Sequence, residues 1–194
     1  MDGYISYQRD SIWTLSFWQD ILCLLLNEQM ANTLSISITK ILESMTLNWP
    51  ECGATVSPAI LRLFRVSDMF HNTVKLHVEK YNLQCADFGV LCTLRRSPSP
   101  YCLSPTVLYQ SMLFSSGGLT KVLGRLSQAE LIERLDNPED KRSKLVQLTG
   151  KGQQLVEMIL PALHQQDQKM LQVLSSDEQA QLNSLLQRVL EQTE

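Results

Sequence analysis

The hydrophobic pattern of the chain is helical over most of its length. Apolar residues recur three and four positions apart in successive segments, which is the spacing of one face of an α-helix. Two shorter stretches, 131–135 and 145–148, alternate as strands do and flank a turn, so they predict a β-hairpin. The pattern predicts helices over residues 10–30, 32–46, 58–81, 87–96, 104–110, 115–126, 150–174 and 175–190, with a linker at 48–57.

The helix before the hairpin has two distinct faces. Leu119, Val122, Leu123 and Leu126 form its apolar stripe. Ser115 or Ser116 is expected to cap its first turn, because a hydroxyl accepts a hydrogen bond from the free amides there. The other face combines small and cationic residues, which lets a polyanion approach closely: Gly117, Gly118, Thr120, Lys121, Gly124, Arg125 and Gln128.

The hairpin carries positive charge at its tip. Asn137–Asp140 supplies turn chemistry, and Lys141, Arg142 and Lys144 follow it on the return strand. Ser104–Gln110 is expected to be the first helix of a helix-turn-helix, with Ser104 as its cap and Pro105 in its first turn. A reading helix followed by a basic two-stranded ribbon is typical of a winged helix-turn-helix.

These residues resemble the MarR family of bacterial transcription regulators. The family's Asp-x-Arg wing signature is matched by Asp140 and Arg142, and its Leu-Thr-x-x-Gly helix start by Leu148, Thr149 and Gly152. The similarity covers roughly residues 58–190. It implies a mainly α fold with a small β-hairpin wing, arranged as a two-fold dimer through the N- and C-terminal helices.

The expected DNA contacts lie on the helix-turn-helix and the wing. Thr120 and Lys121 are nearest to base edges and phosphates, and Arg125 is expected to clamp the DNA backbone one turn later. Arg142 is the candidate for minor-groove entry, with Asp140 steering its guanidinium. The full set is Ser104, Thr106, Ser115, Ser116, Gly117, Thr120, Lys121, Arg125, Asp140, Lys141 and Arg142.

The length of the terminal helices predicts a homodimer. One reading helix contacts only a few base pairs, and a two-fold axis places two of them one turn of DNA apart on a palindromic operator. The expected organisation is an N-terminal helical extension at 1–50, dimerisation helices at 58–82 and 150–194, and a winged helix-turn-helix at 83–149.

Charge distribution agrees with a DNA partner better than total charge does. The 194 residues carry a formal charge of −3. Between Arg95 and Gly152, nine Lys and Arg stand against five Asp and Glu, so this segment is +4 and the remainder is −7. The longest apolar run, Ile21–Leu26, is too short to span a bilayer, and the start has no secretory signal. We therefore expect a cytoplasmic protein without a membrane partner.

The resemblance also implies a small aromatic or phenolic effector that releases a repressor from DNA. Family members often bind such ligands between the dimer helices and the DNA-binding lobe. Residues here that could line such a cleft are Trp13, His71, Asp87, Phe88, Arg95 and Tyr109. A urate-responsive branch needs an acidic residue after the aromatic of the second common helix and an Arg in the reading helix. Gly89 and Val122 or Lys121 stand there, which argues against urate.

Two alternative functions remain open from the sequence. Cys85, Cys92 and Cys102 could make the regulator redox-responsive, although no thiol has an obvious cationic activator. The winged domain could instead be a protein-interaction module with weak DNA binding. No phosphate loop, HExxH pair or nucleophile elbow is present, so an enzyme is not expected and no cofactor is implied.

Overall fold

The structure is a computed structural model that describes residues 36–113, 118–138, 140 and 143–192. The chain divides into two compact units, Met1–Leu61 and Arg62–Glu194. The helix predicted over residues 10–30 lies outside the described residues. The described part of the first unit holds α2 (Ile38–Asn48), α3 (Pro50–Thr55) and the first turn of α4 (Pro58–Val78).

The first unit contains a pair of short helices. Ser37 caps α2 by accepting a hydrogen bond from the Lys40 amide at 3.2 Å, which agrees with the predicted helix over its described part. The linker predicted over residues 48–57 is wrong, because α3 occupies most of it. Pro50 is tolerated at the first helical position. Gly53 lets α3 approach α2, since a Cβ there would lie 2.9 Å from the Thr46 Cα.

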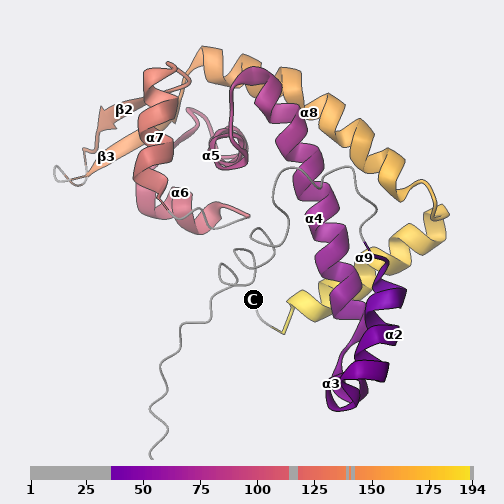
Figure 1. Cartoon of the computed structure of the whole chain (residues 1–194). Coiled ribbons are helices and arrows are strands. Elements are labelled where there is room, and N and C mark those ends of the chain that lie inside the picture. The colour runs from indigo at the N-terminus through magenta and orange to yellow at the C-terminus, as the bar shows by residue number, and fades with distance from the viewer. Residues whose placement is uncertain (1–35, 114–117, 139, 141–142, 193–194) are drawn as a thin grey trace, which may run out of the picture. The chain divides into compact units, whose positions relative to one another are not determined.

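The second unit follows the predicted element order (Figure 1). After α4 come η1 (Glu79–Tyr81), α5 (Cys85–Arg95), β1 (Cys102–Leu103), α6 (Pro105–Ser111), α7 (Leu119–Gln128), β2 (Ile132–Asp136), β3 (Lys144–Leu148), α8 (Gly150–Leu171) and α9 (Ser176–Leu190). The mainly helical fold with a small wing is therefore confirmed.

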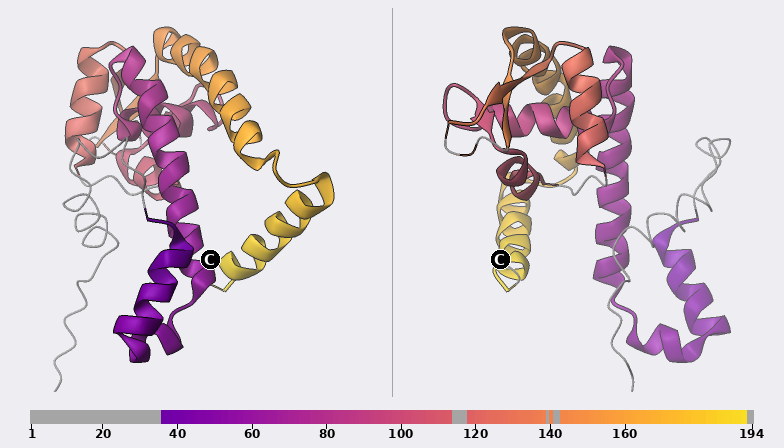
Figure 2. Two further views of the ribbon diagram at one scale, coloured as in Figure 1. Left: turned by 45° about the vertical axis from the view of Figure 1, so that its right-hand side comes forward. Right: turned by 90° about the vertical axis from the view of Figure 1, so that its left-hand side faces the viewer.

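The sheet has three antiparallel strands in the order β1-β3-β2. The predicted hairpin pairs Ile132 with Leu148 at its root and Asp136 with Lys144 toward its tip. Strand β1 pairs Cys102 with Gln147 and was not predicted, because two residues are too short to show alternation. The sheet lies beside α7. Helices α5, α6 and α7 and the strands lie close together in both views of Figure 2.

The hydrophobic core lies in the winged lobe, which consists of α5, α6, α7 and the three strands, and extends to α4 and α8. Its largest fully buried side chains come from α4, α5, α6, α7, the sheet and α8: Leu91, Leu94, Leu108, Leu126, Ile132, Ile159, Val78, Val90, Val146 and Val156. Leu126 belongs to the predicted apolar stripe of the reading helix. Burial of this stripe against α5 and β2 fixes which face of α7 remains exposed.

Side-chain caps begin several helices where the sequence predicted them. Ser104 starts α6 and accepts from the Val107 amide, and Thr149 starts α8 and accepts from the Gly152 amide at 3.0 Å. Ser175 and Glu178 form a capping box at the start of α9, the helix predicted over residues 175–190. Helix α5 begins two residues before the predicted Asp87, because Asp87 is the third residue of the helix and accepts from the Gln84 amide.

The start of α8 is packed directly on the turn that follows α7. The Thr149 amide donates to the Leu131 carbonyl at 3.1 Å, and the Thr149 hydroxyl donates to the Glu130 carbonyl at 2.8 Å. A Cβ at Gly152 would overlap the Leu131 carbonyl oxygen, so only glycine fits there. The backbones of the two segments are therefore in direct contact.

Within the described part of the chain, none of the helices combines the length and the apolar character needed to cross a membrane.

Candidate nucleic-acid interface

The reading helix begins later than the sequence predicted. Gly118 is its N-cap, with a φ of 94° that favours glycine, and Leu119 is its first residue. The predicted cap by Ser115 or Ser116 is therefore wrong, because Gly118 takes the N-cap position. Ser115, Ser116 and Gly117 precede the helix and lie outside the described residues.

The exposed face of α7 is polar and includes one position without a side chain, Gly124. Thr120, Lys121 and Gly124 are all exposed on it, opposite the buried apolar stripe. A Cβ at Gly124 would meet no described atom within 4 Å, so the helix backbone is open to the outside there. Lys121 supplies a positive charge within the first turn of the helix. We call Thr120, Lys121 and Gly124 the reading face.

Arg125 differs from Lys121 because it is bound within the subunit. Its Nη2 donates to Asp87 Oδ1 at 2.7 Å, and its Nε lies 3.2 Å from the same oxygen. The Asp87 side chain is 4% exposed, whereas that of Arg125 is 42% exposed. The sequence interpretation placed Arg125 at the DNA and Asp87 in a ligand cleft, and the structure brings the two together.

The described part of the wing is held by local hydrogen bonds. The Asn137 side chain donates to the Ser143 hydroxyl at 2.9 Å, and the Ser143 amide donates to the Asp140 carbonyl at 3.0 Å. Lys144 pairs with Asp136, which lowers the pKa of that carboxyl. Lys141 and Arg142 lie outside the described residues, so their predicted contacts stay predictions.

Helix α6 presents the other expected DNA-contacting residues. The Ser104 hydroxyl is occupied by the α6 cap, whereas Thr106 is exposed on the first turn. Arg134 of β2 is also exposed and adds a cation to the wing. Arg134 is one of the nine cations of the segment 95–152, and its place on a predicted strand next to the turn is the sequence signal for a wing cation.

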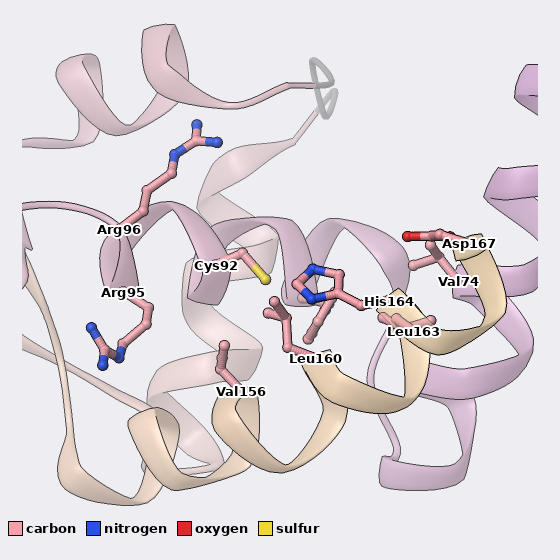
Figure 3. Close-up of a pocket in the computed structure, with 10 residues that line it drawn as sticks. Val74, Cys92, Arg95, Arg96, Val156, Leu160, Leu163, His164 and Asp167 are labelled. Atoms are coloured by element: carbon pink, nitrogen blue, oxygen red, sulfur yellow. The ribbon is translucent and has the colours of Figure 1, made fainter. Parts of the chain in front are cut away.

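A cavity of about 490 Å³ opens between α4, α5 and α8 (Figure 3). Its lining is mostly apolar, with charged or polar groups at the margin: Val74, Phe88, Cys92, Arg95, Arg96, Val156, Leu160, Leu163, His164 and Asp167. The side chains of Cys92 and His164 point toward one another across it, while Arg96 points away (Figure 3). The cavity is large enough for a drug-sized aromatic molecule.

Two of the six predicted ligand residues line this cavity. Phe88 and Arg95 are part of the lining, whereas His71, Asp87 and Tyr109 are not. Trp13 lies outside the described residues. His164 and Cys92 were missed, because the pattern of one helix does not show which residues of a distant helix it faces.

Both arginines at the margin of the cavity are engaged. The Arg95 Nη2 lies 2.7 Å from Glu157 Oε1, and its guanidinium stacks 4.9 Å from the centre of the Tyr101 ring. The hydrogen bond from Arg95 lowers the pKa of the Glu157 carboxyl. Arg96 donates to the Ser111 carbonyl at the end of α6. The wall of the cavity is thus linked by side chains to the helix-turn-helix.

The surroundings of the three cysteines considered for redox sensing favour the protonated thiol. Burial raises the pKa of the Cys92 thiol to about 11 and also raises the pKa values of Cys85 and Cys102. Thiolates are the reactive species, so these environments disfavour oxidation at neutral pH. Across the described ranges, no group of three or more His, Cys, Asp or Glu is placed to hold a metal ion.

Comparison with known proteins gives consistent matches. A family model described as MarR family matches residues 81–143. The multiple antibiotic resistance protein MarR of Escherichia coli is 35% identical over 115 residues, 59% of this chain and 78% of MarR. The transcriptional regulator PecS of Dickeya dadantii is 29% identical over 154 residues, 79% of this chain and 93% of PecS.

Solved structures agree with these sequence matches. A mutant form of E. coli MarR complexed with operator DNA has a TM-score of 0.57 and 29% identity, covering 75% of this chain and 97% of that one. BpsR of Bordetella bronchiseptica, whose DNA binding is regulated by 6-hydroxynicotinic acid, has a TM-score of 0.60 and 25% identity, covering 69% and 98%. With its winged helix-turn-helix and these relatives, the chain belongs to the MarR family.

Proposed function

We propose that this protein is a transcriptional regulator that binds duplex operator DNA in a sequence-dependent way. The observation that carries the proposal is the reading face of α7, where Thr120, Lys121 and Gly124 are exposed beside a wing. The buried stripe of α7 leaves this face outward, and the open backbone at Gly124 permits close approach to a groove. The mutant MarR solved with operator DNA, a structural neighbour, supports the same role.

The proposed functional form is a homodimer. Helix α9, which is described over its whole length, has no buried residue, and its Leu185 and Val189 side chains are 49% and 61% exposed. Helix α4 likewise exposes Phe64 and Met69. Exposed apolar stripes on helices mark interfaces more often than solvated surfaces. A second copy would cover them and present two reading faces to a palindromic operator.

The proposed mode of action is repression relieved by a small aromatic effector in the cavity between α4, α5 and α8. The apolar lining suits a ring, and His164 at the margin can make a polar contact with a substituent. The regulation of BpsR by 6-hydroxynicotinic acid supports an aromatic effector for this chain. The bond from Arg96 to the end of α6 offers a path from the cavity to the helix-turn-helix.

The test uses a duplex selected from a random library by the wild-type protein, and a scrambled duplex of the same composition. Lys121→Ala is expected to change the preference between the two duplexes by about 1–3 kcal/mol, the range for a lost base contact. Arg142→Ala is expected to weaken both duplexes alike and to reduce the salt dependence of binding, because a wing cation acts mainly on the backbone.

Lys169→Ala is the control, since it removes one exposed positive charge from α8 rather than from the reading face. It is expected to leave both affinities unchanged in the same gel-shift titrations. A wild-type protein that retains no duplex from the library, but binds a protein partner, would favour the interaction module instead.

A further inference from the structure

Asp87 is a buried carboxylate whose two oxygens both have partners. Its Oδ2 accepts a hydrogen bond from the Gln84 amide at 2.9 Å, which fixes the carboxylate to the start of α5. Its Oδ1 accepts from Arg125 of α7 at 2.7 Å. Because a buried charge is costly unless it is paired, the side chain has little freedom to move away from this arrangement.

Arg125 approaches this carboxylate with two nitrogens of one planar group. Its Nε and Nη2 lie 3.2 Å and 2.7 Å from the same oxygen. Such a contact restricts the direction of the guanidinium, which a single point charge would not do. Arg125 comes one turn after Lys121 on α7, so a constraint on it is a constraint on the rotation of the reading face.

Apolar packing alone fixes this rotation less strictly. Helix α7 packs on α5 and β2, and its buried residues Val122, Leu123 and Leu126 are all apolar. Apolar contacts tolerate small shifts of one helix on another. A directional ion pair between the two helices removes that tolerance. The pair also lies at the edge of the reading face, where a small rotation moves Lys121 relative to a base edge.

We propose that Arg125 is a positioning residue rather than the phosphate clamp expected from the sequence. Through Asp87 it sets the rotation of α7 and thereby the discrimination between DNA sequences. This inference rests on the DNA-binding function proposed above. Asp87, which is buried and cannot reach DNA, is on this view as important for specificity as a residue of the reading face.

The two roles predict opposite results for Asp87→Asn. If Arg125 clamps a phosphate, the substitution frees its charge, and affinity for every duplex is unchanged or rises. Arg125→Gln would then weaken all duplexes and lower the salt slope by about 0.9, the value for one lost phosphate contact. If Arg125 positions α7, both variants lose preference for the selected duplex, while the scrambled duplex and the salt slope are unaffected.

The experiment measures dissociation constants for the selected and scrambled duplexes by fluorescence anisotropy at several KCl concentrations. Asp87→Asn and Arg125→Gln are each expected to lower the ratio of the two affinities on the order of tenfold, and the double variant no further, because contacting residues couple. Arg125→Lys, which keeps the charge without the two-nitrogen contact, is expected to recover the ratio only in part.

A loss of stability alone would reduce the active fraction for both duplexes and leave their ratio unchanged. Asp87→Asn retains the shape of the buried side chain, so it remains informative if Arg125→Gln does not fold. Lys75→Gln, which breaks an exposed ion pair with Glu79 in η1, is the control and is expected to change nothing.

An unchanged ratio in Asp87→Asn, or a reduced salt slope in Arg125→Gln with additive losses in the double variant, would overturn the inference and leave DNA binding intact. A wild-type protein that selects no duplex would overturn both.

Discussion

The winged lobe and α9 distribute the same kinds of apolar residues in opposite ways. In the lobe, Leu91, Leu108 and Ile132 are completely or almost completely buried. In α9, Val189 and Leu190 remain 61% and 52% exposed. Both regions are amphipathic in sequence, so amphipathicity identifies a face that is covered but not what covers it. The lobe covers its own face, and on the dimer proposed above a second subunit covers that of α9.

The largest effect is expected from a charge on the exposed apolar face of α9. Val189→Asp would place a carboxylate in the proposed subunit interface, so the dimer is expected to dissociate. Loss of one of two linked reading faces lowers affinity for the selected duplex by about 10²–10⁴-fold, the gain that linkage normally provides. Analytical ultracentrifugation and gel-shift titration measure the two effects.

Ser184→Asp, at another exposed position of α9, is the matched control and is expected to leave both properties unchanged. A Val189→Asp variant that stays dimeric would contradict the proposed interface, because the exposed apolar face of α9 would then lie outside the contact between subunits.

A substitution in the lobe is expected to act on stability instead. Leu126 is 1% exposed at the C-terminal end of the α7 stripe. Leu126→Ala is expected to lower the free energy of unfolding by about 2–5 kcal/mol, through lost burial and the cavity left behind. Denaturant titrations at two protein concentrations measure this decrease, which is expected to be the same at both because Leu126 is buried within one subunit. A decrease that depends on protein concentration would mean that the stability of the lobe also depends on the second subunit.

The smallest effect is expected at the exposed face of α7, with opposite signs for stability and function. Gly124→Ala is expected to stabilise the fold by up to about 1 kcal/mol, because alanine favours helix and its methyl group enters open space. Binding to the selected duplex is expected to weaken, because that methyl group stands on the reading face.

Gly150→Ala adds a methyl group in equally open space at the start of α8 and serves as the control. It is expected to leave DNA binding unchanged. Equal DNA affinities for wild type and Gly124→Ala would remove Gly124 from the interface.

Local signals in the sequence predicted most of the fold. The stripe of α7, the alternation of the hairpin and the cap at Ser104 each depend on residues within about two turns or one strand. Helix α3 was missed because Pro50 and Gly53 suggest a linker, although proline suits a helix start and glycine permits close packing. Strand β1 was too short to show a period.

The candidate site was predictable only in part. The exposure of Thr120 and Lys121 follows from the stripe on the other side of their helix. The pairing of Asp87 with Arg125 does not, because the two residues are 38 positions apart and their contact depends on how α5 crosses α7. The same reason explains why His164 was not recognised at the cavity that Phe88 lines.

The backbone contact at Gly152 limits how a signal can travel through this subunit. The Thr149 bonds reach the Glu130 and Leu131 carbonyls, and Gly152 leaves no room for a side chain against the same Leu131 carbonyl. These contacts tie the turn after α7, the wing root and the start of α8 to one another. A molecule that displaced Val156 or Leu160 would therefore tilt the wing root together with α8. In the proposed dimer, such a molecule would change the distance between the two wings.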